Sequence, residues 1–517
     1  MARKGSHKVR TGCLTCKARK VKCDESKPHC NRCIATGRLC SGYLTKVSSG
    51  LLWQRPRQLF QSIDKPSEGR ALQYFCEKTA QFLSGATDPY FWTHLVMQFC
   101  NFEPAVNHSV IAISSLYEQM EDGDGRSHSG VQLRDNSLAL QHYNAAIREL
   151  KTTDNQPLVL LVCILFICIE FLQSNKDAAI KHCKHGIALL DRADYSWAKE
   201  HLLPVFRRLS SFPFLLGAGP FDFPDLASLD SSLPTSFNSF DDAASVLDFL
   251  QSRTLRVVRL GDPYRVGKLR YKTVPSDLLE EQEAVACLLD QWHILFESLD
   301  SGSTLPVTPA TEIYNLGMDF IGLMSRAILL IRYELSRVTL NTAFKADEIC
   351  YDQYLKNFQR ALDACALIDS VVPEEARDPS RKREPQFIFE TGFTVWLHLI
   401  ATRCRDLAMR LEALRLMGLL GVPRENLWEL RQMHALARRV IEIEHGTILD
   451  DDGRPATPVQ YPGLPPDERR VRHTNMEPKP SVYIDLNGKE VCGWSVGFVM
   501  RDEKDAIVTR TEFIIAP

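Results

Sequence analysis

The sequence of 517 residues lacks an apolar run long enough to cross a membrane. Its longest run extends from Leu158 to Ile169 and is closed by Glu170, whereas a transmembrane helix needs about 20 apolar residues. The basic beginning of the chain, MARKGSHKVR, is not followed by the apolar stretch of a secretory signal. We therefore expect no membrane partner, and we interpret residues 158–169 as part of a buried helix.

The usual sequence signatures of enzymes are also missing. There is no Gly-rich dinucleotide motif, no phosphate-binding P-loop and no His-Glu-x-x-His zinc motif. Residues 493–497 (GWSVG) match the nucleophile elbow of hydrolases, but no histidine follows them and the segment is typical of a strand. His182, Cys183 and His185 lie close in sequence without a further ligand nearby, which favours a structural role. We therefore expect that the protein is not an enzyme.

The chain has little net charge, −2 at pH 7, but this value hides an asymmetry. Residues 1–50 contain twelve Lys or Arg and two Asp or Glu, a net charge of +10, so the remainder carries −12. A basic segment attached to a mildly acidic body is typical of a nucleic-acid-binding module joined to a second domain.

Cysteine is the residue type that is concentrated in this basic segment. Six cysteines follow the pattern C-x2-C-x6-C-x6-C-x2-C-x6-C, two copies of one repeat 17 positions apart: Cys13, Cys16, Cys23, Cys30, Cys33 and Cys40. Two tetrahedral zinc ions need eight bonds, and six thiolates supply eight if two of them bridge both metals. The other ten cysteines, from Cys76 to Cys492, show no regular pairing, and we interpret them as reduced thiols of the protein core.

The cysteine segment resembles the fungal binuclear zinc cluster, both in its spacing and in the basic residues 17–22 and the Lys27-Pro28 loop. The resemblance implies two structural Zn²⁺ ions, with Cys13 and Cys30 as the bridging ligands. Cys16 and Cys23 would complete one site, and Cys33 and Cys40 the other. It also implies binding to double-stranded DNA at CGG-type triplets, in a nuclear transcription regulator of RNA polymerase II genes with possible co-regulator partners.

The two repeats differ in charge, which indicates the half that contacts DNA. Lys17, Arg19, Lys20 and Lys22 lie between Cys16 and Cys23, whereas Arg38 is the one cation between Cys33 and Cys40. We expect a short helix beginning near Cys16, with Lys17 and Lys20 on one face and Arg19 and Lys22 on another. Such a helix fits the major groove, where guanine accepts hydrogen bonds from Lys or Arg.

The resemblance places Arg19 and Lys20 nearest the bases, with Lys20 foremost. We assign Lys17, Lys22, Arg10 and Lys8 to the phosphates. Two alternatives remain: the lysines only solubilise a metal module, or the module is a zinc-dependent protein-interaction or co-regulator unit on a helical scaffold without direct DNA binding.

We divide the chain into a basic arm (1–10), the zinc-cluster module (11–42), a linker (43–70), an all-helical regulatory domain (71–447) and a tail (448–517). Leu44, Val47 and Leu51 begin a heptad pattern that Pro56 interrupts. A coiled coil needs three to four heptads, so we expect a monomer, or a dimer formed through the helical domain.

The fold class expected is mainly α, with a short C-terminal β segment. Apolar residues at helical spacing predict helices over 71–83, 91–99, 105–121, 136–151, 158–173, 176–192, 196–210, 241–260, 276–299, 310–338, 346–371, 387–420 and 424–444. Residues 481–486, 491–500 and 506–515 predict strands of a small antiparallel sheet, with Asn487-Gly488 as a hairpin turn. Residues 71–447 resemble the fungal-specific transcription factor domain, most clearly at residues 165–173 and 103–105.

Residues 209–252 contain no Lys or Arg and mix aspartate with phenylalanine. Such mixtures can act as transcription activation segments. The aromatic residues are dense enough to pack, so we favour a long loop on the helical body followed by an amphipathic helix.

Overall fold

A computed structural model describes residues 12–27, 29–38, 40, 65–85, 90–122, 132–192, 195–215, 219, 233–302, 320–371, 385–477, 481–484, 490–502 and 504–515. The chain divides into two compact units, Met1–Asp64 and Lys65–Pro517. The predicted basic arm, the interrupted heptad at 44–51 and the Asn487-Gly488 turn lie outside the described residues.

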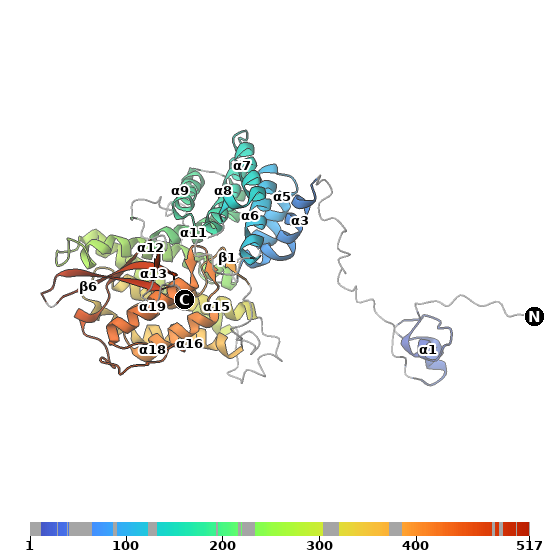
Figure 1. Ribbon diagram of the computed structural model, residues 1–517. Coiled ribbons are helices and arrows are strands. Elements are labelled where there is room, and N and C mark those ends of the chain that lie inside the picture. The colour runs from blue at the N-terminus through green and yellow to red at the C-terminus, as the bar shows by residue number, and fades with distance from the viewer. Residues whose placement is uncertain are drawn as a thin grey trace, which may run out of the picture. The chain divides into compact units, whose positions relative to one another are not determined.

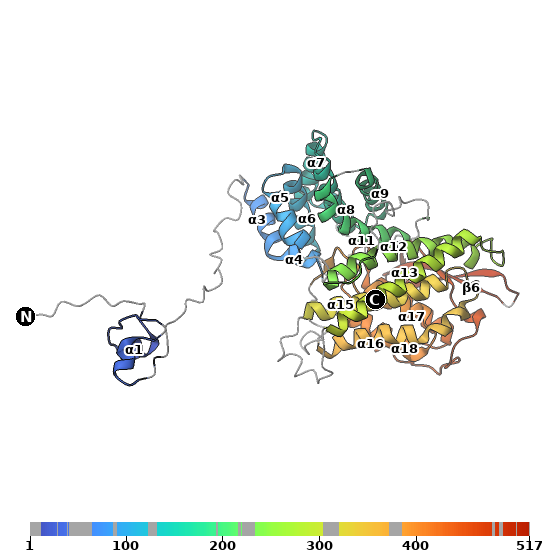
Figure 2. The ribbon, with the colours of Figure 1, turned by 180° about the vertical axis from the view of Figure 1, so that it is seen from behind.

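The first unit contains two short helices, α1 (Leu14–Ala18) and α2 (Asn31–Ala35), joined by extended chain. The second unit is mainly helical (Figures 1 and 2). Its helical segments, with η for π or 3-10 turns, are α3 (Pro66–Tyr74), η1 (Phe75–Thr79), α4 (Ala80–Leu83), η2 (Phe91–Leu95), α5 (Val96–Cys100), α6 (Pro104–Asp122), η3 (Leu133–Asp135), α7 (Ser137–Leu150), α8 (Gln156–Leu172), α9 (Lys176–Arg192), α10 (Ser196–His201), α11 (Leu203–Leu215), α12 (Phe240–Arg265), α13 (Ser276–Gly302), α15 (Phe320–Asn341), η5 (Glu348–Tyr354), α16 (Leu355–Val371), α17 (Thr394–Arg403), α18 (Leu407–Leu420), α19 (Leu430–His445) and η7 (Asp467–Arg469).

Helix α8 contains the longest apolar run of the sequence, and the structure confirms that this run is a buried helix. Residues Leu160 to Leu172 are all buried, because α6, α9 and α10 pack around α8. Its N-terminus is capped by Asn155, whose side chain accepts the Leu158 N–H, with a proline in the first turn. A helix that is apolar on all sides is stable in water only when neighbours cover it.

Some predicted boundaries are wrong. Helix α3 begins at Pro66, inside the range predicted as linker, because proline is favourable in the first turn of a helix. The predicted helix 387–420 is interrupted: β1 (Phe387–Ile388) precedes α17, and a new helix starts after Asp406, which accepts the Met409 N–H. Residues 310–319, predicted as the start of a helix, lie outside the described part of the chain.

The predicted helix start at 424 is also wrong, since Arg424–Glu425 forms strand β2. It pairs parallel with β1 and antiparallel with β3 (Trp428–Glu429). The buried Glu425 carboxylate accepts the N–H groups of Gly392 and Thr394 at 2.9 and 3.1 Å and so caps the start of α17.

A second sheet follows the helices and confirms the predicted C-terminal β segment. Its strands are β4 (His473–Met476), β5 (Ser481–Ile484), β6 (Glu490–Arg501) and β7 (Ile507–Ile515). β4 and β5 pair antiparallel with opposite ends of β6, and β7 pairs with β6 along residues 493–501. Trp494, Val496 and Phe498 of β6 pack against the apolar side of α19, so the sheet belongs to the helical unit.

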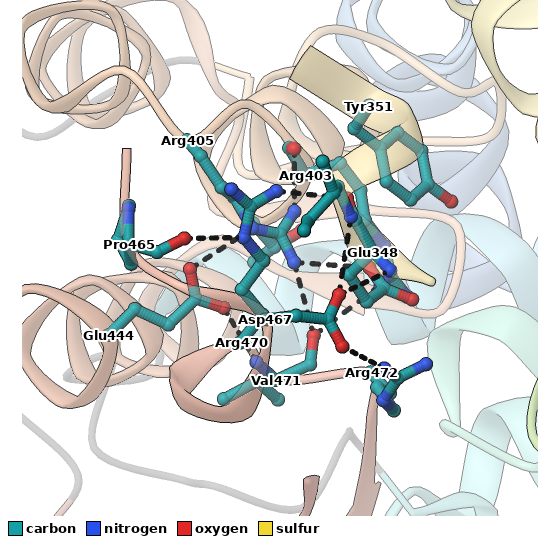
Figure 3. Close-up of polar contacts among 12 residues, drawn as sticks. Glu348, Tyr351, Arg403, Arg405, Glu444, Pro465, Asp467, Arg470, Val471 and Arg472 are labelled. Carbon is teal, nitrogen blue, oxygen red and sulfur yellow. Dashed lines mark hydrogen bonds and ion pairs between the residues drawn. The ribbon is translucent and has the colours of Figure 1, made fainter. Parts of the chain in front are cut away.

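Buried ion pairs join the segment before β4 to the helices (Figure 3). The Glu348 carboxylate is 3.0 Å from Arg403 and 3.1 Å from Arg405. Glu444 lies 2.7 Å from Arg410 and accepts the Val471 N–H at 2.7 Å. Further contacts of the same kind link Arg470 to Asp352 and Arg472 to Asp467. Arg403 of α17 also donates to the Val471 carbonyl at 3.5 Å. Residues 467–472 are therefore fixed to η5, α17 and α19 by contacts with buried charged groups.

Among the described residues, no helix combines the length and apolarity that a membrane crossing needs.

Candidate functional site

The first unit is built from two copies of one local structure, as its repeated spacing predicts. In each copy a cysteine precedes a five-residue helix, and its sulfur accepts the N–H of the cysteine three positions later, at 3.3 Å in both. The N–H of that first cysteine in turn donates to the sulfur ten residues later, at 3.4 Å in both copies. The sulfurs thus act as helix caps and receive backbone donors that favour the thiolate form.

The six sulfurs form two groups of four that share two members. One group is Cys13, Cys16, Cys23 and Cys30, and the other is Cys13, Cys30, Cys33 and Cys40, with all sulfurs of a group within 4.8 Å of one another. The shared pair, Cys13 and Cys30, is separated by 3.5 Å. Zinc–sulfur bonds of about 2.3 Å place tetrahedral ligands about 3.8 Å apart. The donor set therefore fits two zinc ions that share two thiolates, which is the grouping that the family resemblance implies.

The chemistry of these thiols fits a metal centre as well. Cys13, Cys16, Cys30 and Cys33 are fully buried. Burial is the main cause that raises the pKa of the Cys13 thiol to about 12, and it raises the pKa values of Cys16 and Cys30 too. Buried thiolates need cations beside them, and a zinc ion supplies this charge.

The module has little else to hold it together. Its buried cluster in the described residues consists of five cysteines, with Val21 and Cys23 partly buried against them. So few apolar side chains cannot offset the loss of chain entropy on folding. Metal binding and folding of this unit are therefore expected to be one process.

The basic residues of the first repeat lie differently from the prediction. Helix α1 begins at Leu14 and ends at Ala18, so it carries Lys17, while Lys20 and Lys22 follow it. The expected helical faces pairing Lys17 with Lys20 and Arg19 with Lys22 are therefore wrong. The side chains of Lys17, Lys20 and Lys22 are nevertheless all exposed on this one repeat.

Helix α1 ends where it does because the chain turns into a left-handed conformation at Lys20, with φ 56°. The N–H groups of Lys20 and Val21 donate to the carbonyls of Lys17 and Cys16, each at 3.1 Å, which closes a Schellman turn. The second repeat ends in the same turn with Gly37, φ 61°, at the equivalent position. Glycine is the favoured residue there, because it alone adopts this conformation without steric cost.

Two arginines connect the repeats. The Arg19 guanidinium, predicted to lie near the bases, is half-buried and donates to the Thr36 hydroxyl at 3.4 Å. Arg32, which the sequence interpretation did not single out, donates to the Lys22 carbonyl at 2.9 Å and so supports the extended segment that carries Lys22. Asp24 was missed too; its carboxylate accepts the Asn31 N–H at 2.9 Å at the start of α2. An acidic residue a few positions before a helix is the sequence signal that could have indicated it.

The remaining predicted contacts, Lys8 and Arg10, lie outside the described residues. The hydrolase-like residues 493–497 form the middle of β6, paired to strands on both sides, and so make no nucleophile elbow. Gly493 is required there because a side chain would meet the Phe513 ring and the Ile514 carbonyl. In the segment 209–252, Phe212, Phe214 and Phe237 are buried, as expected for a packed segment.

The helical unit contains a pocket that involves α8, α11, α12, α15 and α17, with a cavity volume of about 60 Å³. Two ion pairs line it, Arg208 with Glu390 at 3.0 Å and Arg332 with Asp248. The buried Trp396 indole N–H has no hydrogen-bond partner among the described residues. The buried Ser211 hydroxyl, which also lines the pocket, likewise has no hydrogen-bond partner among the described residues. Aromatic walls are supplied by Phe171, Phe212, Phe240 and Phe389.

Two family models match the chain. Residues 11–49 match the fungal Zn(2)-Cys(6) binuclear cluster domain. Residues 70–218 match the fungal specific transcription factor domain. The first contains the six cysteines, and a domain of this kind holds two zinc ions. The second ends at α11 and its following residues, so the helices from α12 onward lie beyond the matched range.

Curated relatives agree with these matches. The aspercryptin biosynthesis cluster-specific transcription regulator atnN of Emericella nidulans is 26% identical over 336 residues, which cover 56% of this chain and 54% of the relative. The transcription regulator lscL of Purpureocillium lilacinum is 28% identical over 202 residues, 34% of this chain and 48% of that protein. The chain thus spans about half the length of these relatives.

Over the cluster alone, similarity is higher. Arginine metabolism regulation protein II of Saccharomyces cerevisiae is 48% identical over 54 residues, 10% of this chain and 6% of that protein. No solved structure matches the chain.

Proposed function

By its two matched domains the chain belongs to the fungal zinc cluster transcription factors, and from this premise we propose that it is a nuclear transcription regulator that binds double-stranded DNA directly at CGG-type triplets. Its six N-terminal cysteines hold two structural zinc ions, with Cys13 and Cys30 bridging. The first repeat enters the major groove, and the helical unit carries regulation and the contacts with co-regulators.

The observation that carries the DNA part of this proposal is the position of Lys20. The two repeats end in the same left-handed turn, yet one has glycine there and the other has lysine. A non-glycine residue in this conformation costs about 1 kcal/mol or more. A strained residue that is exposed and cationic, between the exposed Lys17 and Lys22, indicates that its side chain is used. Guanine O6 and N7 are acceptors that fit it.

Roles for the neighbouring cations follow from their exposure. Lys17 on α1 and Lys22 on the extended segment contact phosphates on either side of Lys20, together with Lys8 and Arg10 of the arm. Arg19 lies between the repeats and has one hydrogen bond to Thr36. We infer that Arg19 positions residues 17–22. Only the guanidinium N–H groups that do not bond to Thr36 can reach the bases.

The test uses two substitutions at position 20 in the zinc-loaded full chain. Lys20→Ala removes the ammonium and keeps the backbone strain, while Lys20→Gly removes both. We expect both variants to bind a CGG duplex about tenfold or more weakly, with most of the preference over a scrambled duplex lost. Lys20→Gly should hold its fold at least as well as the parent. An equal loss on both duplexes would assign Lys20 to the phosphates instead.

The alternative, a zinc-dependent protein-interaction module, is separated from this proposal by a salt titration. Direct DNA binding predicts an affinity that falls steeply and linearly on a log–log plot, with a slope set by the number of phosphates contacted. A protein-interaction module predicts no specific duplex binding at any salt concentration.

A further inference from the structure

Strand β7 has one edge that pairs with β6 and one that pairs with no other strand in the described part of the chain. It is nine residues long, and the residues from Ile507 to Thr511 are exposed. Ile507 and Val508 in this stretch, and Ile515 at the other end of the strand, are exposed large apolar side chains. Long apolar strand edges invite pairing with another chain, so proteins normally shield them with lysine, proline or a bulge. None of these interrupts β7.

The register with β6 defines the two faces of β7. Ile514, Glu512, Arg510 and Val508 stand opposite Trp494, Val496, Phe498 and Met500. Directly paired residues share a face, so this first set lies on the side of the sheet that packs on α19. The ion pair between Glu512 and Arg439 of α19, at 2.6 Å, agrees with this orientation. Ile507, Thr509, Thr511, Phe513 and Ile515 lie on the other face.

The sequence of β7, IVTRTEFII, is complementary to itself when it is reversed about Thr511. In an antiparallel pair centred there, Arg510 stands opposite Glu512 of the partner subunit and the converse pair forms by symmetry. Val508 meets Ile514, and Ile507 meets Ile515. Cross-strand pairs of opposite charge and of apolar side chains are the kinds that stabilise sheets.

From this complementarity we propose that β7 is a dimerisation edge, to which β7 of a second copy of this chain adds as an antiparallel strand with Thr511 on the twofold axis. The charges select this register. A shift by two positions in either direction places Arg510 opposite Arg510, or Glu512 opposite Glu512. A shift by one joins the α19 face of one copy to the opposite face of the other.

The side chains that form the charged pairs are available for this contact. Arg510 is 53% exposed and rests beside Glu512 of its own strand. The Glu512 carboxylate accepts a hydrogen bond from Arg439 of α19 and is therefore held in place. Arg510 then needs only a change of rotamer to reach the partner's Glu512. The edge therefore presents a fixed carboxylate, Glu512, and an adjustable guanidinium, Arg510. Each can pair with the opposite charge of a second copy.

A dimer of this kind would bring two zinc modules to one DNA molecule without a coiled coil. This consequence rests on the proposed function, whereas dimerisation of the free chain does not. Two linked modules bind two triplets with an avidity that exceeds the affinity of either. Loss of the dimer should therefore weaken binding to paired triplets and leave binding to a single triplet unchanged.

The first test is a disulfide across the axis in the zinc-loaded full chain. Thr511→Cys places two thiols on residues that face each other, with Cα atoms about 4.5–5.5 Å apart, within disulfide range. Thr509→Cys is the matched control: same face and same residue type, but about 13 Å from its copy along the strand. We expect mild oxidation to cross-link Thr511→Cys at least tenfold faster than Thr509→Cys or the parent. Equal rates would overturn the proposal.

The second test reverses one charge. Arg510→Glu places a carboxylate opposite Glu512 of the partner subunit at both symmetry-related positions. We expect the dissociation constant of the dimer, measured by sedimentation velocity without DNA, to rise at least about tenfold. Arg454→Glu, an exposed reversal elsewhere, should have no effect. Mixing Arg510→Glu with Glu512→Arg restores both cross-strand pairs, so a folded mixture should form heterodimers. A mixture of folded monomers, or a parent chain that is monomeric at all concentrations, would overturn the proposal.

Discussion

The zinc module and the helical unit both bury ionisable groups, but they neutralise them in different ways. In the module, the buried groups are thiols such as Cys13 and Cys30, and the cations that match them must come from solution. In the helical unit, Arg405, Arg410 and Glu444 are fully buried, and each finds its counter-charge on another segment of the same chain. We therefore expect the first unit to depend on a metal for its fold, and the second to depend on the completeness of its own ion pairs.

The largest expected effect is the removal of zinc. In zinc-finger peptides, structural zinc contributes about 10–16 kcal/mol of apparent binding free energy at pH 7, far more than a small module can replace. We expect a chelator to abolish hydrogen-exchange protection in residues 13–40 and to leave α8 protected. Cys30→Ser should act like the chelator, because the side chain belongs to both sulfur groups.

Cys23→Ser is the matched control, since Cys23 belongs to one group and is only partly buried. It should lower zinc affinity without abolishing the second site. Protection of residues 13–40 that persists in excess chelator would show that the module folds without metal.

The second effect concerns the ion pairs of the helical unit. Glu444→Ala leaves the buried guanidinium groups of Arg405 and Arg410 without their shared carboxylate. We expect a loss of about 3–5 kcal/mol, because an unpaired buried charge is strongly destabilising. The measurement is the urea midpoint of the helical signal. Glu412→Ala breaks an exposed pair with Arg415 and should cost about 1 kcal/mol or less. Similar losses of unfolding free energy in both variants would contradict the prediction that the buried pair stabilises the unit more than the exposed one.

The features predicted from sequence are those that depend on residues near one another in the chain. The spacing of the six cysteines predicted the two groups of sulfurs that the structure brings together, because ligand spacing is a local property. The apolar run at 158–169 predicted α8, because its hydrophobicity on all sides requires burial. The exposed lysines of the first repeat were identified from composition alone. The glycine at 37 and the lysine at 20 could have been compared as equivalent positions of the repeat, which would have indicated the turn.

The features that were missed depend on contacts between distant segments. Strand β2 was predicted as helix because its pairing with β1 joins residues 37 positions apart, Phe387 with Arg424, and local propensity does not report such contacts. The burial of Arg405 and Arg410 was missed because arginine is normally exposed, and only the folded arrangement brings Glu444 to them. Non-local pairing of this kind is seen only in the structure.

The third effect is a pH dependence that belongs to the helical unit. His445 is fully buried, its Nδ1–H donates to the Tyr461 carbonyl at 2.7 Å, and its Nε2 has no partner among the described residues. Burial, followed by the charge of Arg410, lowers its pKa to about 4, while hydrogen bonding to Tyr461 and the charge of Glu444 oppose this.

Because the folded pKa lies below the unfolded value of 6.5, stability from His445 is complete above pH 6.5 and is lost as the pH falls toward 4. At pH 5 the loss is about 2 kcal/mol. His445→Asn retains a donor for Tyr461 and does not titrate. Between pH 7 and pH 5 the variant should therefore lose about 2 kcal/mol less stability than the parent. Parallel pH profiles of parent and variant would contradict the assignment.

The smallest effect concerns charges that remain in water. Lys17 is exposed on α1, and as a phosphate contact its removal should reduce the salt slope of DNA binding by about 1 and weaken CGG and scrambled duplexes equally. Lys181→Ala, an exposed lysine on α9, should leave the slope unchanged. A change of sequence preference in Lys17→Ala would instead place this side chain at the bases. Removal of one positive charge therefore has different results in the two units. At the surface of the module it changes the number of counterions that DNA releases on binding. In the helical interior it leaves a buried carboxylate without its counter-charge.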